Sequence, residues 1–172
     1  MTTTSFTPQS YRAFFGQLPT GVTVVVSRAA TGPVGLVVGT FASVSLDPPL
    51  VSLMVRTGSR SYDAVSAVGR FTANILASDQ GHLSRALAGW SADKFRDVAL
   101  DDTEDGPLVV RGCLAWADCV IEKEVEAGDH TIVLATPLEL RVARPSARPL
   151  VFCQNGYHRT LRVEDERSPG WL

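Results

Sequence analysis

Short apolar runs rich in β-branched residues recur along the 172-residue chain, and turn-forming residues separate them. The runs "GVTVVVS" (21–27) and "VGLVV" (34–38) flank "AATGP" (29–33), a pattern typical of a β-hairpin. Further runs of this kind lie at 50–55, 71–76, 114–125 and 131–143. The last two flank the turn "EAGDH" (126–130), which predicts a long antiparallel pair. Many short strands with few helices indicate a mainly β fold, and we expect a closed β-barrel with short peripheral helices.

Three segments carry helix signals instead. Thr7 is a suitable N-cap, and apolar residues recur at helical spacing from there to Gly16. A second helix fits between Ser59, as its N-cap, and Gly69, as its stop. We expect a third helix to start at Asp79. The polar segment 90–107 lacks periodicity and is predicted to be a long surface loop that contains Lys94.

Composition excludes several classes of function. The chain has 16 Lys and Arg residues against 18 Asp and Glu residues and no basic block, which argues against a nucleic-acid partner. Because we find neither a long apolar stretch nor a signal-peptide pattern, we expect a cytoplasmic protein without a membrane partner. The cysteines form no C-x-x-C pair, so we expect reduced, buried thiols at Cys113, Cys119 and Cys153.

No familiar catalytic signature is present in the chain. The histidines lack metal-ligand spacing, so we expect no metal site. The motifs of hydrolases, zinc peptidases, P-loop NTPases and Rossmann domains are also missing. Any chemistry is therefore expected to come from a bound cofactor.

Residues 35–52, "GLVVGTFASVSLDPPLVS", join two apolar runs through small and hydroxyl-bearing residues. Small side chains let the backbone approach a flat ring and offer it N–H and C=O groups, and hydroxyls add hydrogen-bond donors. Proline then stiffens the exit at Asp47-Pro48-Pro49. One interpretation is the wall of a flavin site, and the other is a sharp corner of the barrel.

A phosphate site is indicated in "RTGSRSYDAV" (56–65). Ser59, Arg60 and Ser61 open the predicted second helix, where free N–H groups, hydroxyls and a guanidinium converge. The alternative is an ordinary capped surface helix with a solvated arginine.

A set of motifs along the chain resembles one family. These are "LPTGVTVVVS", "GLVVGTFASVSLDPPLV", "SRS", "GRFTANILASDQ", "DKF", "AGDHTIVL" and "GYH". Their order and approximate spacing resemble the flavin reductase-like, FMN-binding split-barrel family, which includes the reductase components of two-component flavin-dependent monooxygenases. On this basis residues 10–160 form one split-barrel domain, between a flexible tail (1–9) and a polar tail (161–172).

The resemblance implies a homodimeric NAD(P)H:flavin oxidoreductase. Such a protein binds FMN or FAD, accepts a hydride from NADH or NADPH, and supplies reduced flavin to a separate oxygenase. The alternative is a flavin-binding protein, or a flavoenzyme that acts on its own organic substrate without releasing reduced flavin.

The resemblance also implies site residues. Matched position by position, the flavin contacts fall on Val38, Gly39, Thr40, Phe41, Ala42, Ser43, Ser45, Ser59, Arg60 and Ser61, with Asn74, Lys94 and Phe95 nearby. His130 matches the family's histidine on the nicotinamide side and is the candidate catalytic residue, although on its own it reads as a turn histidine. Tyr157 is either a barrel-closing aromatic or a contact to the cofactor edge. The chain departs from many relatives at Ala42, where they carry Ser or Thr, and at Gly39, where they carry Asn or Ser.

Overall fold

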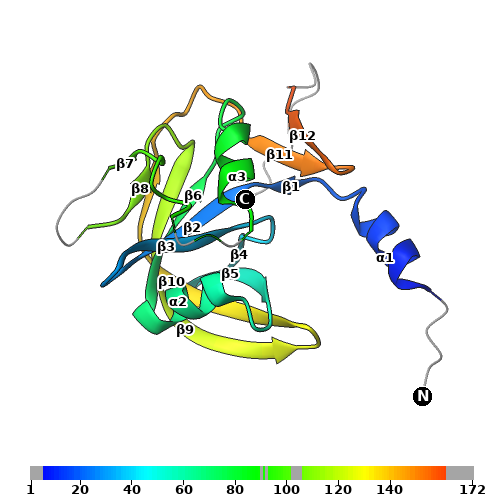
Figure 1. Ribbon diagram of the computed structural model, residues 1–172, viewed down its shortest axis with the longest axis horizontal. Helices are drawn as coiled ribbons and strands as arrows, with labels where there is room; N and C mark the ends of the chain where they lie inside the picture. The colour runs from blue at the N-terminus through cyan, green and yellow to red at the C-terminus, as the bar shows by residue number, and fades with distance from the viewer. Residues whose placement is uncertain (1–5, 90, 92, 102–105, 162–172) are drawn as a thin grey trace.

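The protein is built around one antiparallel sheet of seven strands (Figure 1). The computed structural model describes residues 6–89, 91, 93–101 and 106–161. The sheet has the order β3-β2-β6-β9-β10-β5-β4. Its strands are β2 (Thr23–Ala29), β3 (Gly32–Val38), β4 (Ala42–Leu46), β5 (Pro49–Arg56), β6 (Arg70–Ile75), β9 (Ala115–Ala127) and β10 (His130–Val142). The predicted hairpin and the long antiparallel pair are both confirmed.

The mainly β class is confirmed, but the expectation of a closed barrel is wrong. Strands β3 and β4 are the two ends of the sheet, and no ladder joins them within the described part of the chain. The inner face is closed instead by side-chain packing, where Val38 of β3 meets Val51 and Leu53 of β5 in one core cluster. The barrel is therefore split along this line.

Strand β2 is buried on both faces, which explains its unbroken apolar sequence. Val25 belongs to the barrel core, whereas Val24 and Val26 face a second core cluster on the other side of the sheet. Gly35 of β3 lies so close to β2 that a Cβ atom there would collide with the backbone of Val25. A glycine is required at this position for the two strands to pair.

The second core cluster lies beneath two small sheets. One has the order β1-β11-β12, and the other pairs β7 with β8. Their bounds are β1 (Thr20–Gly21), β7 (Leu100–Asp101), β8 (Val109–Val110), β11 (Leu150–Cys153) and β12 (Gly156–Arg159). The prediction of a surface loop over 90–107 is partly wrong, because Phe95 is buried in this cluster and β7 forms a ladder. Residues 90, 92 and 102–105 lie outside the described residues.

Two of the three helices have the predicted bounds. Helix α1 (Pro8–Phe15) is capped by Thr7, and α2 (Arg60–Val68) runs from its N-cap Ser59 to Gly69, which has a left-handed φ of 75°. Helix α3 (Gly81–Leu87) starts later than predicted, because the carboxylate of Asp79 binds Arg144 rather than capping the helix. Among the described helices, none is long and apolar enough to cross a membrane.

The three cysteines are free thiols, as predicted. Burial raises the pKa of Cys113 to about 11 and that of Cys119 to about 12. Both thiols are therefore protonated and unreactive at neutral pH. The expectation of a buried thiol is wrong for Cys153, which is only partly buried in the short strand β11.

Candidate functional site

A cavity of about 930 Å³ opens between strands β3 and β5, helices α2 and α3, and the β11–β12 hairpin. This volume is in the range of ligand pockets, which run from about 300 to 1,000 Å³. Figure 1 shows α2 and α3 on opposite sides of β3 and β5. We call the side made by the start of α2 the α2 wall, and the side made by α3 and β12 the α3 wall.

The α2 wall presents polar groups to the cavity, and some of them have no partner among the described residues. The Ser59 hydroxyl accepts a hydrogen bond from the backbone N–H of Tyr62 at 3.3 Å. The N–H groups of Arg60 and Ser61 lie in the first helical turn, which has no intrahelical acceptor. The Arg60 side chain lines the cavity, and it has no hydrogen-bond or ion-pair partner among the described residues. A cation at a helix N-terminus opposes the helix dipole unless an anion binds there.

Lys94 adds a second cation behind this wall. Its Nζ donates to Ser61 Oγ and to the carbonyl of Gly89, both at 3.1 Å. Burial lowers the pKa of Lys94 from its ordinary value, because both acceptors are neutral and offer no compensating charge. Ser61 and Gly89 both line the cavity, so an anion bound at the α2 wall would meet two positive charges.

The α3 wall is aromatic and internally bonded. The Tyr157 and Ser84 hydroxyl oxygens lie 2.8 Å apart and share one hydrogen bond. The Arg85 guanidinium lies over the Tyr157 ring, 5.4 Å from its centroid. Phe152 packs against the same ring edge to face, with the ring centroids 5.3 Å apart. These contacts fix the Tyr157 ring at the edge of the cavity, where a planar ligand could pack against it.

The floor of the cavity contains the end of β3. Val38, Gly39 and Thr40 line it, as the flavin-wall prediction requires. However, Thr40 Oγ1 accepts from the backbone N–H of Met54 at 2.9 Å and donates to its carbonyl at 3.0 Å. The only proton of this hydroxyl is therefore already used, so Thr40 cannot be the hydroxyl donor that we expected.

The contacts around position 39 explain why a glycine stands there. A Cβ atom at this position would lie 2.8 Å from the Thr20 hydroxyl oxygen. The Thr20 side chain thus occupies the space that an Asn or Ser side chain would need. The departure at Gly39 is accommodated by β1, which brings Thr20 to the rim of the cavity.

The remaining residues of the predicted flavin wall lie away from the cavity. Phe41 turns inward and packs on the barrel core. Ala42, Ser43 and Ser45 belong to strand β4, which pairs with β5 and carries them along the edge of the sheet. None of these four residues is among those that line the cavity, and their contact with a cofactor stays a prediction.

Two other predicted residues have interior roles. Asn74 is fully buried, and its amide donates to the carbonyl of Leu108 at 3.2 Å and accepts from the N–H of Val110 at 2.9 Å. Phe95 is part of the second core cluster. Neither lines the cavity; both stabilise its surroundings, and their contact with a cofactor stays a prediction.

His130 lies outside the cavity but next to its rim. It stands at the turn between β9 and β10, half-exposed, with Nδ1 2.7 Å from a carboxylate oxygen of Asp129. In the ladder it is directly opposite Arg56, which lines the cavity. Opposed residues share a face of the sheet, so His130 and Arg56 lie on the same side. Its catalytic role stays a prediction.

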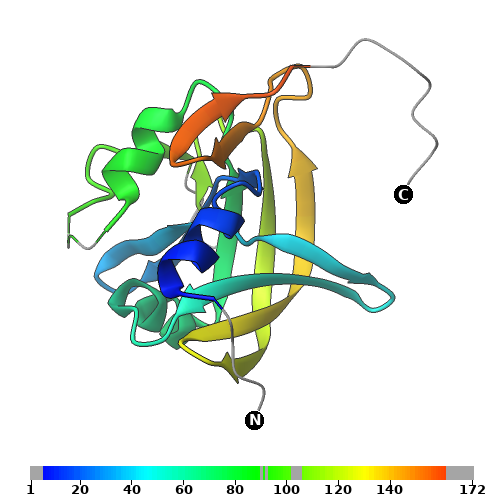
Figure 2. The same ribbon diagram turned by 90° about the vertical axis from the view of Figure 1, so that its right-hand side faces the viewer.

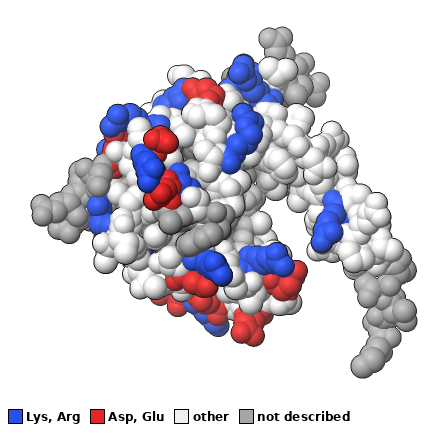
Figure 3. Space-filling model, in the orientation of Figure 1, with Lys and Arg blue, Asp and Glu red and all other residues white. Residues whose placement is uncertain are grey.

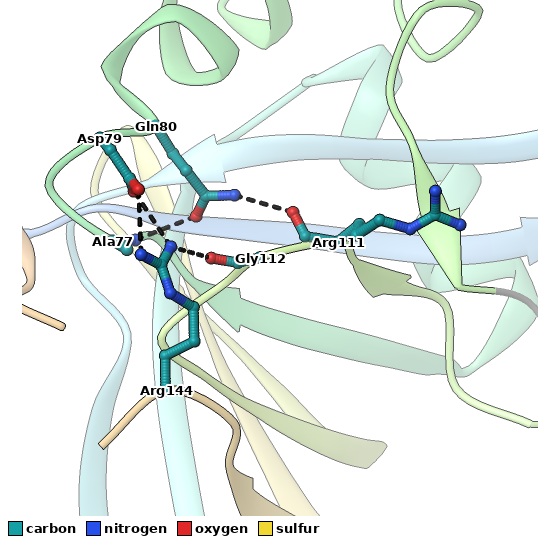
Figure 4. A network of polar contacts seen from close by, with 6 residues as sticks. All are labelled: Ala77, Asp79, Gln80, Arg111, Gly112 and Arg144. Atoms are coloured by element: carbon teal, nitrogen blue, oxygen red, sulfur yellow. Dashed lines mark hydrogen bonds and ion pairs between the residues drawn. The ribbon is translucent and has the colours of Figure 1, made fainter. Parts of the chain in front are cut away.

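A polar network holds the start of α3 in place (Figure 4). The Arg144 guanidinium binds both carboxylate oxygens of Asp79, at 3.1 and 3.0 Å, and the carbonyl of Gly112 at 2.8 Å. The buried Gln80 side chain accepts from the N–H of Ala77 and donates to the carbonyl of Arg111, both at 3.0 Å. This network anchors the segment that leads into α3, which has no side-chain cap of its own.

Several residues of the cavity were not predicted. They include Thr20, Gly21, Met54, Arg56, Ser84, Leu87, Ala88, Gly89 and Phe152. The alternation of buried and exposed residues in β5 could have indicated Met54 and Arg56. Both lie on the other face of the strand from the buried Val51, Leu53 and Val55. The others reach the cavity only through tertiary packing.

Comparison with known proteins gives a consistent picture. The flavin reductase-like domain model matches residues 15–161. A flavin reductase of Pseudomonas putida is 36% identical over 151 residues, which cover 87% of this chain and 88% of that protein. HsaB of Mycobacterium tuberculosis, the reductase subunit of a flavin-dependent monooxygenase, is 34% identical over 162 residues, covering 94% and 85%.

Two solved structures extend the likeness to the fold. Nitrilotriacetate monooxygenase component B from Mycobacterium thermoresistibile superposes with a TM-score of 0.87 at 32% identity, covering 95% of this chain and 92% of that one. The NADH:FAD oxidoreductase SgcE6 of Streptomyces globisporus, solved in complex with NAD and FAD fragments, gives 0.85 at 30% identity, covering 95% and 100%. Together with the match over most of its length, these relatives show that the chain belongs to the flavin reductase-like domain family.

Proposed function

We propose that this flavin reductase binds FMN or FAD in the cavity, with the flavin phosphate at the α2 wall, and reduces it with NADH or NADPH. The observation that carries the proposal is a pair of cations, Arg60 and Lys94, with no anionic partner in the described part of the chain. They lie beside the first-turn N–H groups of α2, which have no intrahelical acceptor. Charge-assisted hydrogen bonds of this kind suit a phosphate monoester or diester.

In this proposal the residues of the chain position the flavin and the nicotinamide, and none of them reacts covalently. A bound flavin supplies the hydride acceptor for a reduced nicotinamide. The backbone at Val38 and Gly39 lies where a flat ring can approach closely, since Gly39 has no side chain. The Tyr157 ring, held by Ser84, limits how the ring system can tilt. His130 and Arg56, on one face of the β5–β10 ladder, are placed to bind the nicotinamide nucleotide at the rim.

Reduced flavin is proposed to leave for a separate oxygenase. Exposed residues form much of the rim, including Gly21, Met54 and Arg56, so the cavity is open to solvent and exchange is not blocked. Relatives named as reductase subunits of flavin-dependent monooxygenases support the same role. A second copy of the chain, related by twofold symmetry, is proposed to complete the open side of the site.

The test is the oxidation of NADH or NADPH, followed by nicotinamide absorbance, with and without free FMN or FAD in excess over enzyme. A reductase that releases its product is accelerated by free flavin over many turnovers. A protein that only holds flavin gives at most one turnover. An enzyme with its own organic substrate is not accelerated by excess flavin, and either of these results would contradict the proposal.

A further inference from the structure

Helix α1 carries an apolar surface that its own chain does not cover. No residue of the helix is buried. The exposed residues around it are Phe6 (54%), Tyr11 (49%), Phe14 (73%), Phe15 (48%) and Leu18 (59%). Figure 1 shows the helix standing away from the rest of the molecule, and Figure 3 shows an open notch between them. We call residues 6–18 the arm.

The arm is held in a fixed shape at both ends. At its start, Thr7 and Ser10 form a reciprocal capping box. At its end, the N–H of Gln154 donates to the carbonyl of Gly16 at 2.7 Å, and the Gln154 side chain bonds that of Gln17 at 2.8 Å. A helix this short is unstable in water by itself and normally depends on packing of its apolar face. An ordered apolar arm therefore needs a surface to pack on.

A second uncovered apolar surface lies on the far half of β10. Strand β5 pairs with β10 only as far as Ala135, opposite Val51. Beyond that point Leu140 lies opposite Ala117 of β9, which is buried in the barrel core. Opposed residues share a face, so Leu140 is on the core-facing side of the sheet. It is nevertheless 67% exposed.

The neighbouring residues extend this surface. Val142, which pairs with Ala115, is on the same side as Leu140 and is 66% exposed, and Leu138 lies at the adjacent bulge. We call Leu138, Leu140 and Val142 the β10 stripe. In Figure 2 the arm lies toward the viewer, the end of β10 points upward, and the tip of the β4–β5 hairpin points to the right. The inner face of the barrel thus continues into solvent at this end.

We propose that the arm of one subunit packs across the β10 stripe of a second copy of this chain, and that the contact is reciprocal. The inference deepens the dimer that forms part of the proposed function and rests on it. The arm carries a single charged residue, Arg12, so an apolar partner surface suits it. The family model matches from residue 15 onward, so Phe6, Tyr11 and Phe14 of the arm precede the matched range.

The areas agree with a stable dimer. At about 150 to 200 Å² for each complete large apolar side chain, the exposed part of the arm amounts to roughly 500 Å². The β10 stripe exposes roughly 300 Å². Two reciprocal contacts would then bury about 1,600 Å² in total, which is the size of a standard specific interface.

The test is the mass in solution, by size-exclusion chromatography with light scattering at micromolar concentration. We expect the native chain at twice its 18.5 kDa, and Phe14→Glu and Leu140→Arg each alone at the mass of one chain. An equimolar mixture of the two variants should recover the double mass. Each mixed dimer keeps one native contact, and its other contact places Glu opposite Arg. Val68→Glu, a matched change at an exposed apolar residue of α2, should stay dimeric.

Other outcomes overturn the inference. If Leu140→Arg stays dimeric while Phe14→Glu dissociates, the arm packs elsewhere. If Phe14→Glu stays dimeric, the arm is not part of the interface, and a mixture that remains at the mass of one chain excludes direct pairing. Circular dichroism of both variants should match that of the native chain, because both positions are exposed. Flavin-dependent NADH oxidation by the native chain is measured separately, so a failure of the proposed reaction is distinguished from a failure of the arm contact.

Discussion

The two walls of the cavity are built in different ways. The α2 wall is local: Ser59, Arg60 and Ser61 are consecutive, and one helix start supplies their geometry. The α3 wall is assembled from Ser84 and Tyr157, which are 73 residues apart and meet only when β12 is in place. The first wall is cationic and the second is aromatic and neutral in its ligand-facing ring. Recognition of charge can therefore be encoded in a short segment, whereas the placement of a ring depends on the completed fold.

The difference predicts a division of labour in binding. A group that contacts the α2 wall should matter only for ligands that carry phosphate. A group in the α3 wall should matter equally for ligands with and without phosphate, because it contacts or positions the ring system. FMN and riboflavin differ by that phosphate, so their affinities for each variant test whether the two walls differ in this way.

The largest expected effect is that of Arg60→Ala. Loss of one charge-assisted contact costs roughly 1.5 to 3 kcal/mol, which lowers FMN affinity about tenfold to a hundredfold. Riboflavin affinity should hardly change. Flavin fluorescence titration measures both. Arg85→Ala is the matched control, since it removes a guanidinium from the α3 wall, and it should not discriminate between the two ligands. An equal loss for FMN and riboflavin in Arg60→Ala would mean that the helix start is disturbed.

His130→Ala tests the rim, which belongs to neither wall. We expect kcat/KM for the reduced nicotinamide to fall about fivefold to fiftyfold, through KM, because the residue would contribute positioning worth on the order of 1 to 2 kcal/mol. Flavin affinity should remain. Stopped-flow reduction at saturating NADH should show an unchanged limiting rate. A thousandfold collapse of that rate would place His130 in the chemical step, and no change in either parameter would return it to an ordinary turn residue.

The same contrast explains what the sequence could predict. Helix α2 was predictable to the residue because its N-cap Ser59 and its stop Gly69 are local signals. Strand β4 was not recognised, because its pairing with β5 depends on a register interrupted by a bulge at Val44. The interior hydrogen bonds of Asn74 could not be predicted, since its partners at 108–110 lie more than thirty residues away.

The residues of the cavity show the same difference between local signals and tertiary packing. The cations of the α2 wall followed from motifs, whereas Ser84 and Phe152 of the α3 wall could not be inferred from any pattern near them. Even Thr40 shows this limit. Its residue type was correctly read as a hydroxyl at the site, but only the structure shows that the hydroxyl is committed to Met54.

Ser84→Ala and Tyr157→Phe test the α3 wall with a smaller expected effect. Each removes the same hydrogen bond, worth about 0.5 to 1.5 kcal/mol, so we expect a loss of about twofold to tenfold in flavin affinity, equal for FMN and riboflavin. Because both variants break one contact, the double variant should be no worse than either single one. Additive losses would show that the two side chains act independently, and a loss confined to FMN would place the phosphate at the α3 wall.

The smallest expected effect concerns the support of the α3 wall. The hydrogen bond from Arg144 lowers the pKa of Asp79 below its ordinary 3.8. A carboxyl group whose pKa is lower in the folded state stabilises the fold above its unfolded pKa, and this contribution is lost as the pH falls through the folded pKa.

We therefore expect Asp79→Asn to lower the melting temperature by about 1 to 3 °C at neutral pH, because the pair is exposed. The difference from the native chain should disappear as the pH falls through the lowered pKa of Asp79, where the native carboxyl group is protonated as well. Scanning calorimetry across this range measures it. Asp93→Asn, which breaks an exposed ion pair with Arg96 away from the network, should leave the melting temperature unchanged. A difference that grew as the pH fell would show that Asp79 stabilises α3 in its neutral form, and the support of the α3 wall would then not depend on the charge of this pair.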